Sequence, residues 1–111
     1  MSLDLSIGST PCPCCGHQTD KLSFNYTYNV SPMWYKIYPD SKHMVEIEGL
    51  TGKQACVTLC VALTELDLYP EEFIALNPEN GWGSYEGFKE FISDLMKASI
   101  SNPTLVWEAC R

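Results

Sequence analysis

Six cysteines give the chain its clearest potential for chemistry. They are Cys12, Cys14 and Cys15 in one loop, Cys56 and Cys60 further on, and Cys110 near the end. Cys12 and Cys15 form a Cys-x-x-Cys pair followed by Gly16, a pattern typical of a zinc knuckle, in which two thiolates hold one edge of a tetrahedron. Zinc is therefore the cofactor that this loop, at about residues 9–17, suggests.

A closed structural zinc site needs four ligands, and the loop supplies only part of that set. Cys14 or His17 would be the third ligand. Cys56 and Cys60, one helical turn apart, would complete a four-thiolate site if the loop folds over their helix. The alternative is a loop of exposed thiols that oxidise readily, with Cys56 and Cys60 as small core residues.

Three polar residues at every second position indicate a second candidate surface. Asn25, Thr27 and Asn29 alternate with aromatic residues between Leu22 and Val30, which predicts a strand with one aromatic and one polar face. The polar face would bind a polar ligand or a partner, or it is the ordinary solvent-facing side of a sheet.

A glycine-rich loop, Asn77-Pro-Glu-Asn-Gly-Trp-Gly83, precedes a helix that Ser84 is expected to cap. Asn80, Trp82 and the following Tyr85 are candidates for binding a planar anion such as a nucleotide, because helix N-termini attract anions and Trp82 offers a stacking surface. The alternative is that Trp82 fills the domain core. Both interpretations expect Trp82→Ala to be damaging.

An acidic row on the last helix forms the remaining candidate. Glu86, Glu90 and Asp94 recur at four-residue spacing, where like charges repel each other. The row is either a docking surface for a basic partner or a plain solvated helix face. Trp34, an aromatic near the start of an earlier short helix, is a further candidate for partner contact or for self-association into a homodimer.

Few patterns in this sequence indicate catalysis. The two histidines, His17 and His43, lie in no recognisable catalytic motif, so we expect a protein that is not an enzyme. The net charge of −7 disfavours binding to duplex nucleic acid. No apolar run approaches the roughly 20 residues that cross a bilayer. We therefore expect no membrane partner and a cytoplasmic location.

The elements that must position these residues follow from periodicity and caps. We predict strands at Leu3–Ile7, Leu22–Val30, Met44–Glu48 and Thr104–Ala109. We predict helices at Met33–Ile37 with Ser31 as cap, at Gly52–Asp67 with Thr51 as cap, at Pro70–Leu76, and from Ser84 to about Ser99. Apolar residues nearly surround the Gly52–Asp67 helix, so we expect the rest of the domain to cover it.

These elements predict a single α+β domain over residues 1–111. Its small antiparallel sheet would have three or four strands, with two main helices packed on one face.

Three segments carry a resemblance to a family of short uncharacterised proteins of bacteriophages and bacteria. They are Cys12-Pro-Cys-Cys-Gly-His17, Asn25-Tyr-Thr-Tyr-Asn-Val-Ser-Pro-Met33 and Asn77-Pro-Glu-Asn-Gly-Trp-Gly-Ser-Tyr-Glu-Gly87. The resemblance covers most of the chain and brings no activity with it. It implies a phage setting, hence the host cytoplasm and a role in host takeover or counter-defence.

The leading hypothesis is a non-enzymatic protein that binds a host protein through its acidic helix and its Asn/Trp surface. The alternative is a small-ligand binder for a nucleotide-like anion. A zinc or thiol enzyme built on the cysteine loop is the third hypothesis.

Overall fold

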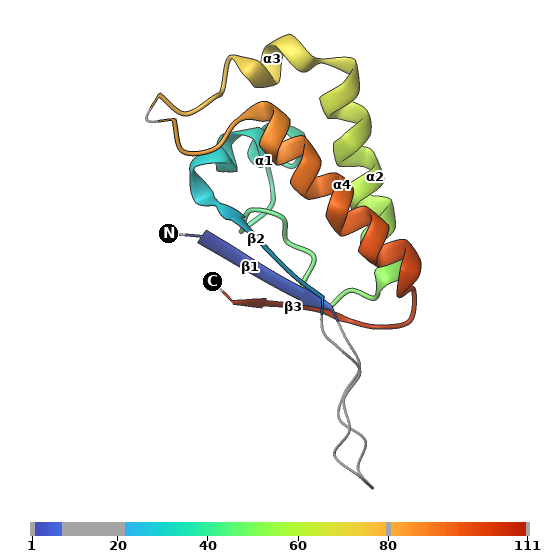
Figure 1. The fold of residues 1–111 in the computed structure, drawn as a ribbon. Coiled ribbons are helices and arrows are strands. Elements are labelled where there is room, and N and C mark those ends of the chain that lie inside the picture. The colour runs from blue at the N-terminus through green and yellow to red at the C-terminus, as the bar shows by residue number, and fades with distance from the viewer. Residues whose placement is uncertain (1, 8–21, 80, 111) are drawn as a thin grey trace, which may run out of the picture.

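The chain forms a three-stranded sheet with its helices on one side (Figure 1). The structure is a computed structural model that describes residues 2–7, 22–79 and 81–110. In chain order the elements are β1 (Ser2–Ile7), β2 (Leu22–Thr27), the 3-10 turn η1 (Tyr28–Val30), α1 (Ser31–Ile37), α2 (Gly52–Leu68), α3 (Pro70–Ile74), α4 (Tyr85–Ser101) and β3 (Trp107–Cys110). The predicted α+β class with two main helices, α2 and α4, is confirmed.

The sheet is antiparallel in the order β2-β1-β3, so the first strand is the central one. Leu3 lies opposite Tyr26, and Leu5 lies between Phe24 and Ala109. Directly opposed residues point to the same face, so these side chains share one face of the sheet. This shared face is the one that the helices cover. Leu3, Leu5 and the next alternate residue, Ile7, are fully buried. The alternation predicted a half-buried first strand, and the structure confirms it.

The two outer edges of the sheet differ. Along β3 runs the segment 49–51, where Gly49 N donates to Trp107 O (3.0 Å) and Trp107 N donates to Leu50 O (2.9 Å). A bridge between Thr51 and Val106 continues this pairing. Within residues 2–7, 22–79 and 81–110, no strand pairs with the outer edge of β2. The described part of the sheet is therefore open along β2.

Helices α2 and α4 pack together over the sheet, and they approach closely at Gly52. A Cβ atom at Gly52 would lie 2.5 Å from Ser99 O and closer still to Asn102 O, so only glycine fits there. The predicted cap is also present: Thr51 Oγ1 accepts from Gln54 N (3.2 Å), while Gln54 Oε1 accepts from Thr51 N (3.0 Å). This capping box fixes the point at which α2 begins.

Two predicted strands were wrong in part or in whole. The strand predicted over 22–30 ends at Thr27, because Thr27 Oγ1 accepts from Asn29 N (3.3 Å) and turns the chain into η1. The strand predicted over Met44–Glu48 is absent, and turns replace it. Val45 has φ 50°, outside the strand region, and its side chain is buried. Apolar burial here comes from a turn rather than from pleated backbone.

Smaller differences concern caps and strand bounds. Ser31 is the first residue of α1 rather than its cap, and Pro32 follows within the first turn. The last strand begins at Trp107 instead of Thr104, after a turn that follows Pro103. These shifts leave the order of the elements unchanged.

The outer side of α2 is exposed, which corrects the expectation that the domain covers this helix. Val57 is 68% exposed and Val61 is 44% exposed, whereas Leu59 and Ala62 on the inner side are fully buried. Periodicity had identified the inner face correctly. It carried no information on what lies against the outer one.

None of the helices in the described ranges is both long enough and apolar enough to span a membrane.

Replacing Gly52 with alanine should destabilise the fold by about 1–3 kcal/mol, because the new methyl group has no room beside α4. Chemical denaturation of Gly52→Ala measures the free energy of unfolding, with Lys97→Ala at an exposed position on α4 as the control. Helix propensity alone predicts the opposite sign. A stabilised Gly52→Ala protein would therefore contradict the close contact.

Glu46 organises the loop after α1 and should make part of the stability pH-dependent. Its carboxylate accepts from Lys42 N (2.9 Å) and lies 3.1 Å from the Ser41 hydroxyl, which accepts from the buried Trp34 indole (3.1 Å). These hydrogen bonds, led by that of Lys42, hold the pKa of Glu46 below its ordinary value of 4.5. A lowered folded-state pKa stabilises the fold above the unfolded-state pKa, and this is lost as pH falls through the folded-state pKa.

Glu46→Gln should accordingly lower Tm at neutral pH, and the gap to the unchanged protein should close in acid below pH 4.5. Thermal melts across the acid range measure this gap. Glu79→Gln, an exposed loop carboxylate, serves as the control. A gap that stays constant with pH would refute the role given to the Glu46 carboxylate.

Candidate functional site

The start of α4 is fixed to the sheet and to α2 by side-chain hydrogen bonds. Ser84 N donates to the Tyr26 hydroxyl (3.1 Å), and Ser84 Oγ accepts from Gly87 N (3.0 Å), which makes Ser84 the predicted cap. Tyr85 N donates to Asn77 Oδ1 (2.8 Å). Two of the N–H groups that a helix leaves unpaired at its start are thus already taken.

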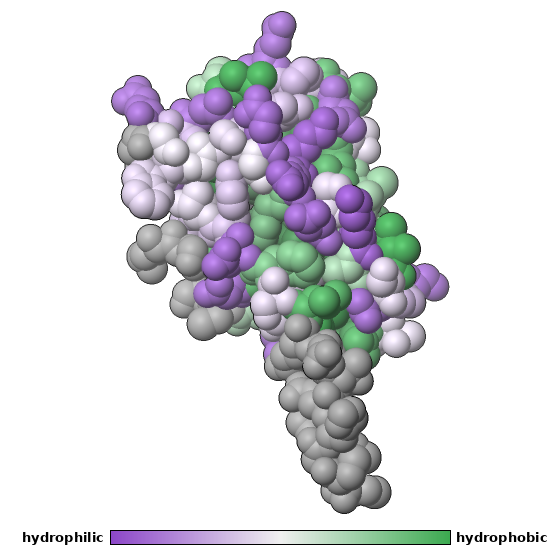
Figure 2. All heavy atoms as spheres, viewed as in Figure 1, coloured by the Kyte–Doolittle hydropathy of each residue, from purple (hydrophilic) through white to green (hydrophobic). Residues whose placement is uncertain are grey.

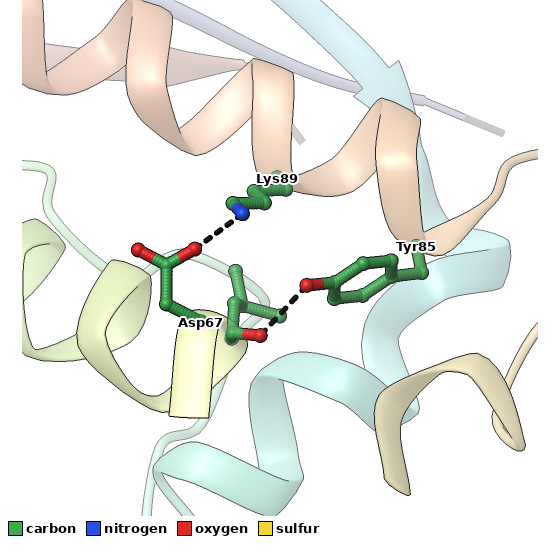
Figure 3. A network of polar contacts seen from close by, with 4 residues as sticks. Asp67, Tyr85 and Lys89 are labelled. Atoms are coloured by element: carbon green, nitrogen blue, oxygen red, sulfur yellow. Dashed lines mark hydrogen bonds and ion pairs between the residues drawn. The ribbon is translucent and has the colours of Figure 1, made fainter. Parts of the chain in front are cut away.

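Tyr85 ties α4 to the end of α2 (Figure 3). Its hydroxyl donates to Leu66 O over 2.7 Å. In a longer helix that carbonyl would accept from the residue four positions on, but this residue is Pro70, which has no N–H. Tyr85 supplies the missing donor and is buried. Its part in the structure is to join two helices.

One glycine of the loop before α4 and one in the first turn of α4 make close contacts within the chain. Gly83 has φ +97°, and a Cβ atom there would lie 2.7 Å from Thr27 Cγ2 and 2.8 Å from Val30 Cγ1. At Gly87 a Cβ would lie 3.0 Å from Tyr26 Cζ and closer still to its hydroxyl. Gly83 therefore lets the loop approach β2 and η1, and Gly87 lets α4 approach Tyr26.

Trp82, between Gly81 and Gly83, is 69% exposed. The interpretation that Trp82 fills the domain core was wrong, and the side chain is at the surface. Asn80, its predicted companion, lies outside the described residues. Sequence could not decide the position of Trp82, because a glycine-flanked aromatic suits a core plug and a surface anchor equally well.

A salt bridge draws one lysine away from the acidic row of α4. Lys89 pairs with Asp67 at the end of α2 (Figure 3), and this hydrogen bond raises the pKa of Lys89. The Lys89 ammonium also lies 6.0 Å from the centre of the Tyr85 ring. Among the described residues, the carboxylates of Glu86, Glu90 and Asp94 form no ion pair. The row keeps its negative charge at the surface.

A groove of about 360 Å³ runs between β2 and α4 and brings two of the predicted surfaces together. Its lining residues are Ser23, Phe24, Asn25, Tyr26, Gly87, Glu90, Phe91 and Asp94. Residues from both faces of β2 line it, so the groove follows the outer edge of that strand. Within the lining the Tyr26 and Phe91 rings stack with centroids 5.5 Å apart. The groove thus combines hydrogen-bonding and acidic groups with an aromatic pair.

Other predicted site residues do not reach this groove. Thr27 is half-buried beside Gly83, and Asn29 is exposed on η1, where the strand alternation has ended. Trp34 is buried under the loop that follows α1, so it is not available for partner contact or for self-association. Glu86 is exposed on α4 and lies outside the lining of this groove. The polar row predicted from Asn25, Thr27 and Asn29 therefore reduces to its first member.

Sequence reasoning did not single out Ser23 as a site residue, nor did it pair Asp94 with the strand. Ser23 lies two positions before Asn25 on the same polar face, and Asp94 lies one turn after Glu90. Both signals were present in the alternation and in the acidic row. What the sequence could not reveal is that β2 and α4 lie side by side.

The zinc prediction rests largely on residues outside the described ranges, namely Cys12, Cys14, Cys15 and His17. Cys56 is half-buried and Cys60 is exposed, so Cys60 is not the small core residue of the alternative interpretation. Over 2–7, 22–79 and 81–110 no three His, Cys, Asp or Glu side chains cluster as metal ligands. Zinc binding stays a prediction of the sequence.

Comparisons with protein-family models, with curated proteins and with solved structures give no match for this chain. The function is therefore argued from the geometry of the described residues.

Trp82→Ala should leave the free energy of unfolding within about 0.5 kcal/mol of the unchanged protein, because the side chain is mostly exposed. Tyr85→Phe should cost about 1–3 kcal/mol, since it leaves the buried Leu66 carbonyl without a donor. Urea denaturation of the two variants compares them directly. Equal losses in the free energy of unfolding of the two variants would contradict the exposed position of Trp82.

Proposed function

We propose that this protein is a binding protein that holds an extended, basic segment of another protein along the outer edge of β2, beside the acidic row of α4. The observation that carries the proposal is the groove in which Asn25 of an edge strand meets Glu90 and Asp94 of α4. No catalytic role is proposed.

An edge strand presents a row of backbone N–H and C=O groups that a second chain can pair with. Extended peptides bind to such edges by adding a strand, and backbone hydrogen bonds then supply the affinity. β2 is at the edge of the described sheet, and Ser23 and Asn25 on it are exposed. An extended occupant is therefore favoured over a helical one.

Side chains of an added strand would alternate between the two faces of the sheet. Those on the helix-covered face would point toward α4, where Glu90 and Asp94 line the groove. Lysine or arginine at every second position of the occupant would meet these carboxylates. The alternation thus sets the spacing of the residues that are recognised, and the carboxylates set their charge.

Electrostatics favours a basic occupant for a second reason. Lys89, which precedes Glu90 on α4, is engaged by Asp67. The chain as a whole carries −7. Complementary charge mainly raises the rate of association and selects among partners, and its contribution falls as salt screens it.

The nucleotide alternative finds less support at the start of α4. Anion sites at helix N-termini use unpaired N–H groups, and here Tyr85 N and Gly87 N donate to Asn77 and Ser84. Glu86 in the first turn adds repulsion. Exposed Trp82 remains a suitable contact for a protein partner.

Fluorescence anisotropy with a labelled peptide tests the proposal. The probe alternates lysine with threonine or valine, and its control carries glutamate in place of lysine. We expect the combined variant Glu90→Gln, Asp94→Asn to weaken binding about tenfold, which is ~1.4 kcal/mol. The matched variant Glu71→Gln, Glu79→Gln removes the same charge elsewhere and should bind like the unchanged protein.

Strand addition is tested separately with a probe N-methylated at every second residue on its pairing edge. This probe should lose most of its affinity, because its backbone can no longer donate to β2. Equal weakening by the two double variants would reduce the effect to general charge attraction. Undiminished binding of the N-methylated probe would exclude an added strand.

A further inference from the structure

Helix α2 carries a long uncharged stretch that continues over its exposed side. From Gln54 to Thr64 the helix contains no charged residue. A helix that is apolar all round is normally buried on every side. Here Val57 is 68% exposed, Val61 is 44% exposed, and Cys60 between them is exposed as well. The described domain leaves this face uncovered.

The exposed face is also hollowed. A groove of about 480 Å³ lies between α2 and the end of α4, and its lining residues are Lys53, Cys56, Val57, Cys60, Val61, Ser99, Ile100 and Pro103. Ile100 is 60% exposed. Figure 2 shows hydrophobic surface along the right-hand side of the molecule, where α2 lies in Figure 1. An apolar, concave face of this kind is typical of an interface.

The spacing of the exposed residues on α2 is that of a helix–helix seam. The exposed residues Lys53, Val57, Cys60, Thr64 and Asp67 are alternately four and three positions apart. This is the repeat with which one helix packs along another. The Thr64 hydroxyl donates to Cys60 O (2.8 Å), so its hydrogen bond is made within α2. The middle of the seam thus consists of small side chains without unmet polar groups.

The ends of this seam carry opposite charges at equal distances from Cys60. Lys53 lies about two turns before Cys60, and Asp67 lies about two turns after it. If two copies of α2 pack antiparallel about a two-fold axis at Cys60, each Lys53 faces the Asp67 of the other copy. Asp67 contacts Lys89 through Oδ1, and its second oxygen is the one that Lys53 would approach. The seam is therefore complementary to itself.

We propose that a second copy of this chain covers the face, and that the two α2 helices pack antiparallel with Cys60 at the two-fold axis. A two-fold interface uses one patch twice, so it requires the self-complementarity that the seam has. Packed helix axes lie about 8–10 Å apart, which brings facing Cα atoms to roughly 3.5–5.5 Å. Two Cys60 side chains at the axis are then within reach of one another.

Sedimentation equilibrium of the full chain over a wide concentration range tests the assembly under reducing conditions. We expect reversible monomer–dimer behaviour, with Val57→Glu weakening dimerisation at least about tenfold because it buries a charge at the interface. Ile74→Glu adds the same charge at another exposed apolar position, on α3, and should dimerise normally. A monomer at all concentrations, or equal effects of the two variants, would overturn the proposal.

The orientation is tested by charge exchange. Lys53→Glu alone should weaken the dimer, and Lys53→Glu combined with Asp67→Lys should restore it. If the double variant Lys53→Glu, Asp67→Lys does not restore the dimer, the antiparallel arrangement is contradicted.

Cys60 reports the position of the axis. Mild oxidation should join two copies by a Cys60–Cys60 disulfide, with the two thiols giving up two protons and two electrons to the added oxidant. Mixing isotope-labelled with unlabelled chain identifies this link by mass spectrometry of peptides. Cys60→Ser should dimerise in the centrifuge yet lose the link. Linked peptides that never contain Cys60 in both chains would place the axis elsewhere and refute the proposal.

Discussion

Tyr26 is the side chain through which the sheet and helix α4 are held together. Its ring stacks on Phe91, its hydroxyl accepts from Ser84 N, and it lies against Gly87, where a methyl group would not fit. One residue of β2 thus determines where α4 begins and how closely it approaches the strand. The edge groove exists because this contact brings the helix to β2 while the outer edge of the strand stays open in the described part of the fold.

The second organising contact is that between α2 and α4. The two helices approach closely at Gly52 and are joined at the other end by Tyr85 and Leu66. This contact uses one side of α2 only. The other side is as apolar as the surface of a buried helix, but it is exposed in the described domain. The composition of α2 is that of a helix buried on both sides, but the described domain buries only one of them. The two candidate surfaces therefore belong to different elements and do not compete for the same residues.

Much of the framework was predictable from local chemistry. Thr51 with Gln54, and Ser84 with Gly87, act as the caps that the sequence indicates, and the alternation of Leu3, Leu5 and Ile7 identified a strand. Local competition explains the errors. The hydroxyl of Thr27 binds the next turn and ends β2 early, which removes Asn29 from the polar row. Such hydrogen bonds form between near neighbours in the chain. Residue patterns give their average tendency and do not show which of them forms.

The site itself was predictable in part. Asn25 and Glu90 could be named from the sequence, but their proximity depends on Tyr26, and no pattern expresses a contact between a strand and a helix so far apart in the chain. Likewise, the uncharged stretch of α2 was visible, whereas the exposure of Val57 was not. Periodicity tells which residues avoid water. It does not tell whether the same chain or another one shields them.

The segment 49–51 has a consequence for how sheets of this protein can grow. By pairing with Trp107 and Val106 it occupies the outer edge of β3 with backbone that begins a helix one residue later. Sheets that are open at both edges can extend chain after chain into fibres. Because the start of β3 is already paired, a second sheet finds less free backbone there than along β2. The short connection before α2 thus directs edge-to-edge joining toward the β2 side.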